Sequence, residues 1–179
     1  MTESEKVFVL GGCRSGKSRF ALACAEREGK NRIFIATLQP GDEEMKERIK
    51  RHQRDRGENW HTAEAPIELA ATLKEHAQEG NVVLIDCLTL WISNLLIAGH
   101  TTEEILAKAE KLSKVVDSSP CTVILVSNKV GSGVVPDNRL GRDFRDAAGL
   151  VNQEIARICS KVVLVTAGIP QVIKNGVME

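Results

Sequence analysis

Eight consecutive residues near the start of the chain have the types and spacing of a phosphate-binding loop. Residues 11–18 read Gly-Gly-Cys-Arg-Ser-Gly-Lys-Ser and satisfy the pattern G-x-x-x-x-G-K-[ST]. The glycines let backbone N–H groups turn toward phosphate oxygens, and a following helix adds the partial positive charge of its N-terminus. The pattern predicts a nucleotide phosphate site made by Gly11, Gly12, Cys13, Arg14, Ser15, Gly16, Lys17 and Ser18.

Two side chains of this loop are expected to do more than surround the phosphates. We expect the Lys17 ammonium to hold the β- and γ-phosphates and the Ser18 hydroxyl to ligate Mg²⁺. A glycine turn capped by serine is the structural alternative, but such a turn would not need Lys17. An apolar run at residues 7–10 precedes the loop and a helical pattern follows it, which is the context that the motif requires.

A second acidic group follows the apolar run at residues 82–85. Asp86 has the position of a Walker B carboxylate at the carboxyl end of a strand, and we expect it to reach the same Mg²⁺. The alternative is that Asp86 caps a helix beginning near Thr89, a common role for aspartate.

Asn128 after another apolar run suggests the base-reading motif of regulatory GTPases, but Gly131 replaces its aspartate, so a GTPase is disfavoured.

A charged stretch at residues 42–56 contains a candidate nucleophile, His52. Acidic residues begin the stretch and basic residues end it, the order that the helix dipole favours. Met45, Ile49 and His52 fall at i, i+4 and i+7, so His52 shares the apolar stripe of this predicted helix. A partly buried histidine bonded to a backbone carbonyl is the structural alternative, and the spacing alone leaves both roles open.

Short β-branched runs alternate with longer helical patterns along the chain. They predict strands at 7–10, 32–36, 82–85, 122–126 and 161–165, and helices at 18–29, 42–56, 66–78, 89–98, 102–117 and 143–159. Runs that are apolar throughout are typical of parallel strands buried on both faces. The alternation predicts a single domain over residues 1–179 with an α/β, three-layer, P-loop NTPase-like (RecA-like) fold. Its mostly parallel sheet would be flanked by helices, with an antiparallel edge strand at 171–174 and a functional loop at 128–140.

Composition restricts the class of partner. The chain has 24 basic and 24 acidic residues and a formal charge of zero, which disfavours nucleic acid or an anionic membrane surface. The five cysteines are odd in number and never form a C-x-x-C pair, so we expect reduced thiols in a cytoplasmic protein, without a disulfide framework or zinc site. No apolar run has the length of a signal peptide or a membrane span. A small-molecule partner is therefore expected.

Further motifs follow the phosphate loop in a fixed order. They are Ile35-Ala36-Thr37, Arg48-Ile49-x-x-His52, Trp60-x-Thr62-x-Glu64, Asp86-Cys87-Leu88-Thr89-x-Trp91-x-x-Asn94-Leu95, Val130-Gly131-x-Gly133-x-Val135-Pro136 and Arg142-x-Phe144-Arg145-Asp146-x-x-Gly149-x-x-Asn152-Gln153. The ordered set resembles the adenosylcobinamide kinase/adenosylcobinamide-phosphate guanylyltransferase family over nearly the whole chain. Many kinases share the phosphate loop, whereas the later motifs are specific.

The resemblance implies a bifunctional enzyme of cobalamin biosynthesis. Such an enzyme phosphorylates adenosylcobinamide and then transfers GMP from GTP onto that phosphate through a guanylylated histidine, giving adenosylcobinamide-GDP. The resemblance places this histidine on His52 and implies a homotrimer. The nucleotide contacts that it implies beyond the phosphate loop are Ile35, Ala36, Thr37, Gln53, Arg54, Asp55, Arg56, Glu64 and Asp86.

Two other functions stay open from the residues themselves. A monofunctional P-loop kinase of a small metabolite would use Lys17, leave His52 structural and form no covalent GMP adduct. A nucleotide-dependent switch protein would instead need a partner surface. No base-reading motif shows whether ATP or GTP serves the kinase step. Lys129 departs from the family pattern, because relatives commonly carry glutamate at this position.

Overall fold

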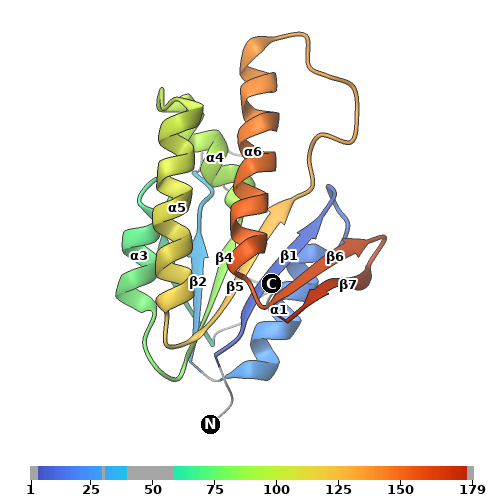
Figure 1. Cartoon of the computed structure of the whole chain (residues 1–179). Helices are drawn as coiled ribbons and strands as arrows, with labels where there is room; N and C mark the ends of the chain where they lie inside the picture. The colour runs from blue at the N-terminus through green and yellow to red at the C-terminus, as the bar shows by residue number, and fades with distance from the viewer. Residues whose placement is uncertain (1–3, 30, 40–58, 177–179) are drawn as a thin grey trace.

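The structure is a computed structural model that describes residues 4–29, 31–39 and 59–176 of the chain. A central sheet lies between layers of helices (Figure 1). The elements in chain order are β1 (Lys6–Gly11), α1 (Lys17–Glu28), β2 (Asn31–Ala36), β3 (Trp60–Glu64), α3 (Leu69–His76), β4 (Asn81–Asp86), α4 (Leu88–Ile97), α5 (Thr102–Ser118), β5 (Thr122–Asn128), α6 (Arg139–Ile158), β6 (Lys161–Thr166) and β7 (Ile169–Asn175).

The sheet has seven strands in the order β3-β2-β4-β5-β1-β6-β7. Strands β1 to β6 pair in parallel, and β7 joins the edge antiparallel to β6. Strand β5 lies between β1, which leads into the phosphate loop, and β4, which ends at Asp86. The carboxyl ends of the parallel strands therefore meet at one edge, where α/β proteins bind their ligands.

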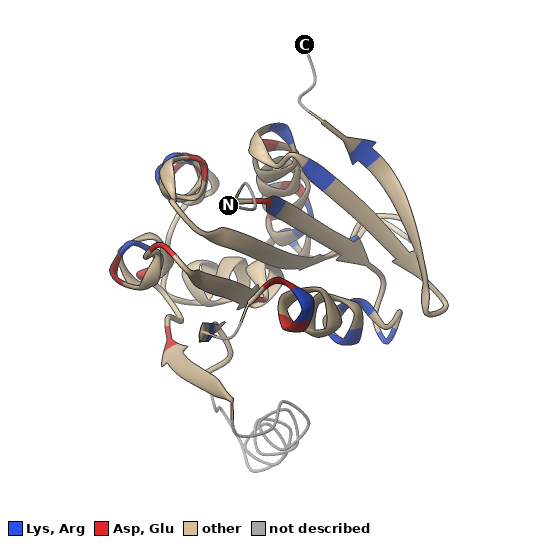
Figure 2. Cartoon of the chain, turned by 90° about the horizontal axis from the view of Figure 1, so that it is seen from below, with Lys and Arg blue, Asp and Glu red and all other residues tan. Residues whose placement is uncertain are grey.

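Two apolar layers bury the sheet on both faces. Val83 and Ile85 of β4 pack into the cluster formed with α3, α4, α5 and α6. Val82 and Leu84 alternate with them and pack into the cluster that contains Ala21 and Ala25 of α1. Charged residues lie mainly on the helices, while most of each strand is uncharged (Figure 2). This two-sided burial explains why the strands are apolar throughout.

The structure confirms the predicted fold class, including the antiparallel edge strand, which is β7. It adds β3, which the sequence did not reveal because this edge strand is only half-buried and its sequence, WHTAE, is largely polar. Helix α6 begins at Arg139, four residues before the predicted start at 143. Its first turn lacks an apolar pattern but is capped by Asn138, whose side chain accepts from the Gly141 N–H at 2.7 Å. The helix predicted at 42–56 lies outside the described residues.

Candidate active site

The phosphate loop joins β1 to α1 at the carboxyl edge of the sheet. Gly16 precedes α1 with φ of 94°, and Arg14 has φ of 53°. A Cβ at Gly11 would collide with the Ser15 side chain and would lie 2.7 Å from the Val165 carbonyl oxygen. Glycine is therefore required at 11 by close packing and is strongly favoured at 16 by its left-handed backbone. The loop is a tight turn, in which the Ser15 N–H donates to the Gly12 carbonyl at 3.3 Å.

Two neighbouring segments hold this loop in place. The Gly168 N–H donates to the Ser15 carbonyl at 2.8 Å, from the turn between β6 and β7. On the other side, the Lys129 N–H donates to the Gly11 carbonyl at 3.0 Å. Ala167 and Gly168 both have positive φ, of 51° and 81°, so the supporting turn is tight. The sequence analysis missed this support, although Gly168, three residues after the predicted strand at 161–165, is a turn signal.

Lys17 and Ser18 open helix α1, so both side chains lie at the helix N-terminus. The Lys17 ammonium donates to the Gly12 carbonyl at 3.2 Å and therefore lies over the loop rather than away from it. The Ser15 hydroxyl is buried within the loop and has no hydrogen-bond partner in the described part of the chain. Polar donors thus converge where the motif predicts phosphate oxygens.

The register of the sheet places Asp86 and Glu64 on the same face. Both residues pair with Ala36, Asp86 from β4 and Glu64 from β3. Paired residues on neighbouring parallel strands project to the same side, and Ala36 packs into the apolar cluster that contains α1. The two carboxylates therefore lie on the α1 side of the carboxyl edge, the side from which Ser18 comes.

The alternative role of Asp86 as a helix cap is wrong. Helix α4 begins at Leu88, its N-cap residue is Cys87, and no side chain caps it. Burial and then the neighbouring Asp86 carboxylate raise the pKa of the Cys87 thiol to about 11. Cys87 is therefore a neutral, buried thiol at physiological pH. All five cysteines are free, as the sequence analysis predicted.

Ile35 and Thr37 have structural partners, although both fall in a motif for which nucleotide contacts are expected. Ile35 is completely buried in the cluster on the α3–α6 side. The Thr37 hydroxyl donates to the Cys87 carbonyl and accepts from the Cys87 N–H, both at 2.8 Å. The Asn94 side chain donates to the Thr37 carbonyl at 2.7 Å. Of the three motif residues, only Ala36 lies on the α1 face, so Thr37 instead fixes the backbone that follows Asp86.

Replacing Thr37 by valine is expected to lower the free energy of unfolding by about 1–3 kcal/mol, because the buried Cys87 N–H would lose its partner. The Cys87 carbonyl would keep the Trp91 N–H as a donor. Denaturant titration measures this effect. Thr72→Val is the matched control, because the Thr72 hydroxyl bonds only to the carbonyl one turn earlier in an exposed position. An equal loss of stability in both variants would contradict the assigned role of Thr37.

Five of the predicted site residues cannot be placed in the structure. They are His52, Gln53, Arg54, Asp55 and Arg56, which lie outside the described residues.

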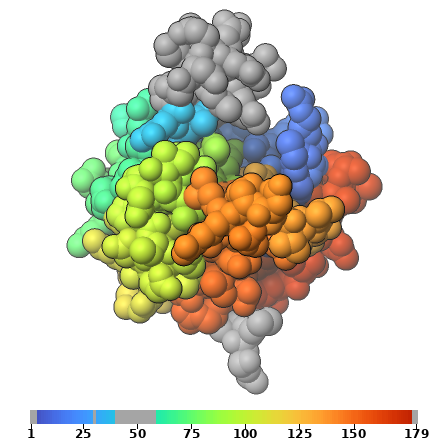
Figure 3. Space-filling view, turned by 90° about the horizontal axis from the view of Figure 1, so that it is seen from above, coloured from blue at the N-terminus to red at the C-terminus, as the bar shows by residue number. Residues whose placement is uncertain are grey.

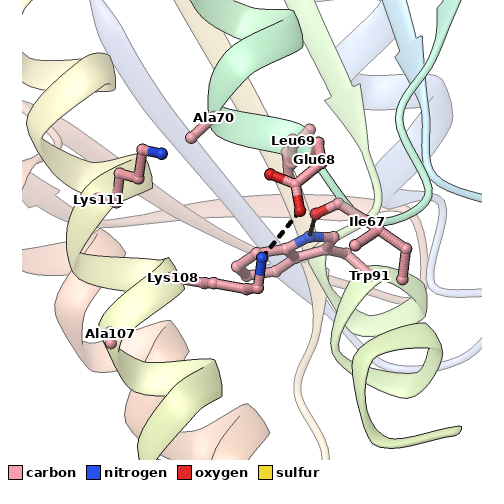
Figure 4. Close-up of a pocket in the computed structure, with 8 residues that line it drawn as sticks. All are labelled: Ile67, Glu68, Leu69, Ala70, Trp91, Ala107, Lys108 and Lys111. Carbon is pink, nitrogen blue, oxygen red and sulfur yellow. Dashed lines mark hydrogen bonds and ion pairs between the residues drawn. The ribbon is translucent and has the colours of Figure 1, made fainter. Parts of the chain in front are cut away.

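A separate cavity of ≈ 250 Å³ lies between α3, α4 and α5 (Figure 4). The Trp91 indole N–H donates to the Ile67 carbonyl at 2.8 Å beside it. The Lys108 ammonium bonds the Glu68 carboxylate at 2.9 Å, and this hydrogen bond lowers the pKa of Glu68. None of the cavity's lining residues belongs to the phosphate loop, and neither Glu64 nor Asp86 lines it. The cavity is therefore distinct from the candidate active site.

Within the described ranges, no helix combines the length and apolar character needed to cross a membrane.

Comparisons with known proteins identify the family of the chain. The family model described as cobinamide kinase/cobinamide phosphate guanyltransferase matches residues 7–173. The chain is 43% identical over 167 residues to the bifunctional adenosylcobalamin biosynthesis protein CobP of Pseudomonas aeruginosa, covering 93% of this chain and 96% of that protein. It is 38% identical over 180 residues to the bifunctional adenosylcobalamin biosynthesis protein CobU of Escherichia coli, covering 94% and 99%.

Solved structures with low sequence identity share the fold. One, from Pyrococcus horikoshii OT3, has a TM-score of 0.59 at 11% identity, covering 96% of this chain and 86% of that chain. Another, an ATPase from the type III secretion system of pathogenic bacteria, has a TM-score of 0.54 at 10% identity, covering 90% and 51%. The second match supports the P-loop ATPase architecture, while the family model and the close relatives specify the family. The chain therefore belongs to the cobinamide kinase/cobinamide phosphate guanyltransferase family.

Proposed function

We propose that this chain carries out two successive reactions on one acceptor. In the first, adenosylcobinamide is phosphorylated by ATP or GTP. In the second, GMP is transferred from GTP to the new phosphate through a guanylylated His52, giving adenosylcobinamide-GDP. The observation that carries the proposal is the convergence of Lys17, Ser18 and Asp86 at the carboxyl edge of the sheet, in a chain whose family performs both reactions.

The kinase step follows from the phosphate loop. The acceptor hydroxyl oxygen attacks the γ-phosphorus, the bond from that phosphorus to the β-γ bridging oxygen breaks, and a nucleoside diphosphate leaves. The hydroxyl proton is released to solvent. Lys17 and the loop N–H groups hold the phosphates in position and stabilise the charge that builds on the leaving group.

A magnesium ion fits the oxygen donors that the structure brings to this edge. In the described ranges, no three His, Cys, Asp or Glu residues come together as an all-protein metal cage. Magnesium does not need such a cage, because it commonly binds one or two protein oxygens together with water and substrate phosphates. Ser18 and Asp86 would hold it, with Glu64 on the same face two strands further along the sheet. When bound, the ion would neutralise phosphate charge during transfer.

The guanylyl step needs a nucleophile that is neutral at physiological pH. An imidazole largely meets this condition, and it can attack the α-phosphorus of GTP while pyrophosphate leaves. A phosphate oxygen of the acceptor then attacks the same phosphorus, the N–P bond breaks, and the imidazole is released. Arg54 or Arg56, just after His52 in the sequence, would clamp the transferred group, and Gln53 and Asp55 would contribute nucleotide contacts.

Labelled GTP tests the proposal. Purified protein with Mg²⁺ should form an acid-labile, alkali-stable adduct on His52 from α-labelled GTP and none from γ-labelled GTP, as located by mass spectrometry. No adduct under conditions where GTP demonstrably binds would instead favour a monofunctional P-loop kinase.

We also propose that the enzyme is a cytoplasmic homotrimer. Strand β7 supports association because it is an edge strand with apolar side chains on its surface: Ile169 is 70% exposed, Val172 52% and Ile173 54%. Exposed apolar edge strands commonly pair with another chain. Five free cysteines fit a reducing compartment. Light scattering should give about three times the 19.6 kDa chain mass, and a single-chain mass would contradict the trimer.

A further inference from the structure

Three polar side-chain atoms from the end of β5 and from α6 are buried without a hydrogen-bond partner in the described part of the chain. They are the Oδ1 atoms of Asn128 and Asn152 and one terminal nitrogen, Nη1, of Arg145. Asn128 ends β5, whereas Arg145 and Asn152 belong to α6. Buried polar atoms in folded proteins are nearly always paired, so such a group calls for a specific explanation.

Arg145 differs from the other arginines of α6. Arg139 pairs with Asp143, Arg142 donates to two loop carbonyls, and Arg157 pairs with Glu154. By contrast, the Arg145 guanidinium has no carboxylate or carbonyl partner among the described residues. Burying part of an unpaired cation costs stability unless an anion joins it. The observation therefore points to an anionic group that binds here.

These residues are tied to the phosphate loop. The Asn152 amide donates to the Asn128 carbonyl at 3.2 Å, and Asn128 pairs with Gly11 in the sheet. The aliphatic stem of Arg145 lies against Gly131, where a Cβ would be 3.4 Å from the Arg145 Cγ. Seen from above, the start of α6, in orange, lies next to the phosphate loop and the start of α1, in blue (Figure 3).

We propose that Arg145, Asn128 and Asn152 form the subsite for the reacting end of the acceptor. Either amide oxygen suits the hydroxyl group of the first reaction, because a hydroxyl can donate its one proton to it. The guanidinium suits the phosphate that replaces this hydroxyl, because arginine binds phosphate with strong, charge-assisted hydrogen bonds. A single subsite can thus serve both the alcohol and its phosphomonoester. This inference rests on the two-reaction function proposed above.

The position of Arg145 on α6 indicates that the phosphate it would bind belongs to the acceptor and not to the nucleotide. The nucleotide phosphates belong at the N-terminus of α1, on one face of the sheet, whereas α6 packs on the opposite face. In an in-line transfer, the acceptor oxygen must approach from the side opposite the leaving group. The loop beside Arg145 also exposes Val134 by 95% and Val135 by 56%, apolar surface that suits a large acceptor such as a corrinoid.

Arg145→Gln tests the subsite by removing the charge while keeping a polar side chain. In GMP transfer to adenosylcobinamide phosphate, the KM for this acceptor should rise about 10- to 100-fold, the range expected when a hydrogen bond to a charged group is lost. The KM for GTP and the amount of GMP adduct formed without acceptor should stay at wild-type values. Arg145→Lys should recover part of the affinity. Arg139→Gln is the matched control, because Arg139 lies on the same helix but is 88% exposed.

Different results identify what failed. An unchanged KM for the acceptor in Arg145→Gln would contradict the proposed subsite. A raised KM for GTP, or loss of the GMP adduct, would also contradict it, because Arg145 would then bind the nucleotide. If the wild type forms no adduct, the guanylyl function itself fails. The subsite is then tested in the kinase reaction, where adenosylcobinamide phosphate should inhibit Arg145→Gln at least about 10-fold more weakly than wild type. Equal inhibition would contradict the proposal.

Discussion

Replacing His52 by asparagine is expected to reduce GMP transfer by more than about 1,000-fold while most kinase turnover remains. The physical reason is that only the guanylyl step needs a nucleophile that becomes covalently attached to phosphorus. In the kinase step the acceptor attacks the nucleotide directly, so the imidazole has no bond to make. Steady-state assays of each reaction, with mass spectrometry of the GMP adduct, measure the two effects separately.

His76→Asn is the control for this experiment. His76 ends α3, and its carbonyl accepts from the side chain of Asn81, the first residue of β4. It therefore lies at the amino end of the strands, away from the phosphate loop, and both reactions should continue in the variant. Equal loss of kinase and guanylyl transfer in His52→Asn would show that His52 supports the whole site and is not a nucleophile for one step.

The fold was predictable because its main signals are local. Strands β1, β4 and β5 are buried on both faces, so their apolar runs identify them without knowledge of their neighbours. The phosphate loop was predictable for a similar reason, because Gly16 is favoured by its own left-handed backbone and Gly11 is required in part by the Ser15 side chain, four residues later. Strand β3 was missed because an edge strand that is half-exposed has neither a full apolar run nor a clear alternation.

The candidate site was predictable only where its chemistry lies in a contiguous motif. Thr37 bonds to Cys87, 50 residues later, so its role depends on how two strand ends meet. Gly168 supports Ser15 from the far end of the chain. Within the described residues, Arg145 Nη1 has no hydrogen-bond partner because of which groups lie near it in space, and spacing along the helix carries no such information. The partners of these residues therefore depend on contacts between distant parts of the chain, which the sequence motifs do not reveal.

Replacing Lys17 by alanine is expected to reduce kinase turnover by at least about 100-fold, the usual effect of removing one preorganised charge from a transfer site. The fold should remain intact, because among the described residues the Lys17 ammonium has one hydrogen bond, to the Gly12 carbonyl, and this bond is exposed. We expect GMP adduct formation to fall as well, since the same loop would hold the pyrophosphate that leaves when His52 attacks. Kinetic assays and the α-labelled GTP experiment measure both losses.

Arg27→Ala is the control, because Arg27 lies exposed in the last turn of the same helix, and neither reaction should change. The comparison also decides how many nucleotide sites the enzyme uses. Loss of both reactions in Lys17→Ala would mean that one phosphate loop holds the donor nucleotide in each of the two steps. The reacting end of the acceptor would then lie beside this loop first as a hydroxyl and later as a phosphate. Loss of kinase turnover with full adduct formation would contradict this, because GTP would then have to reach His52 from a second site that does not depend on the phosphate loop.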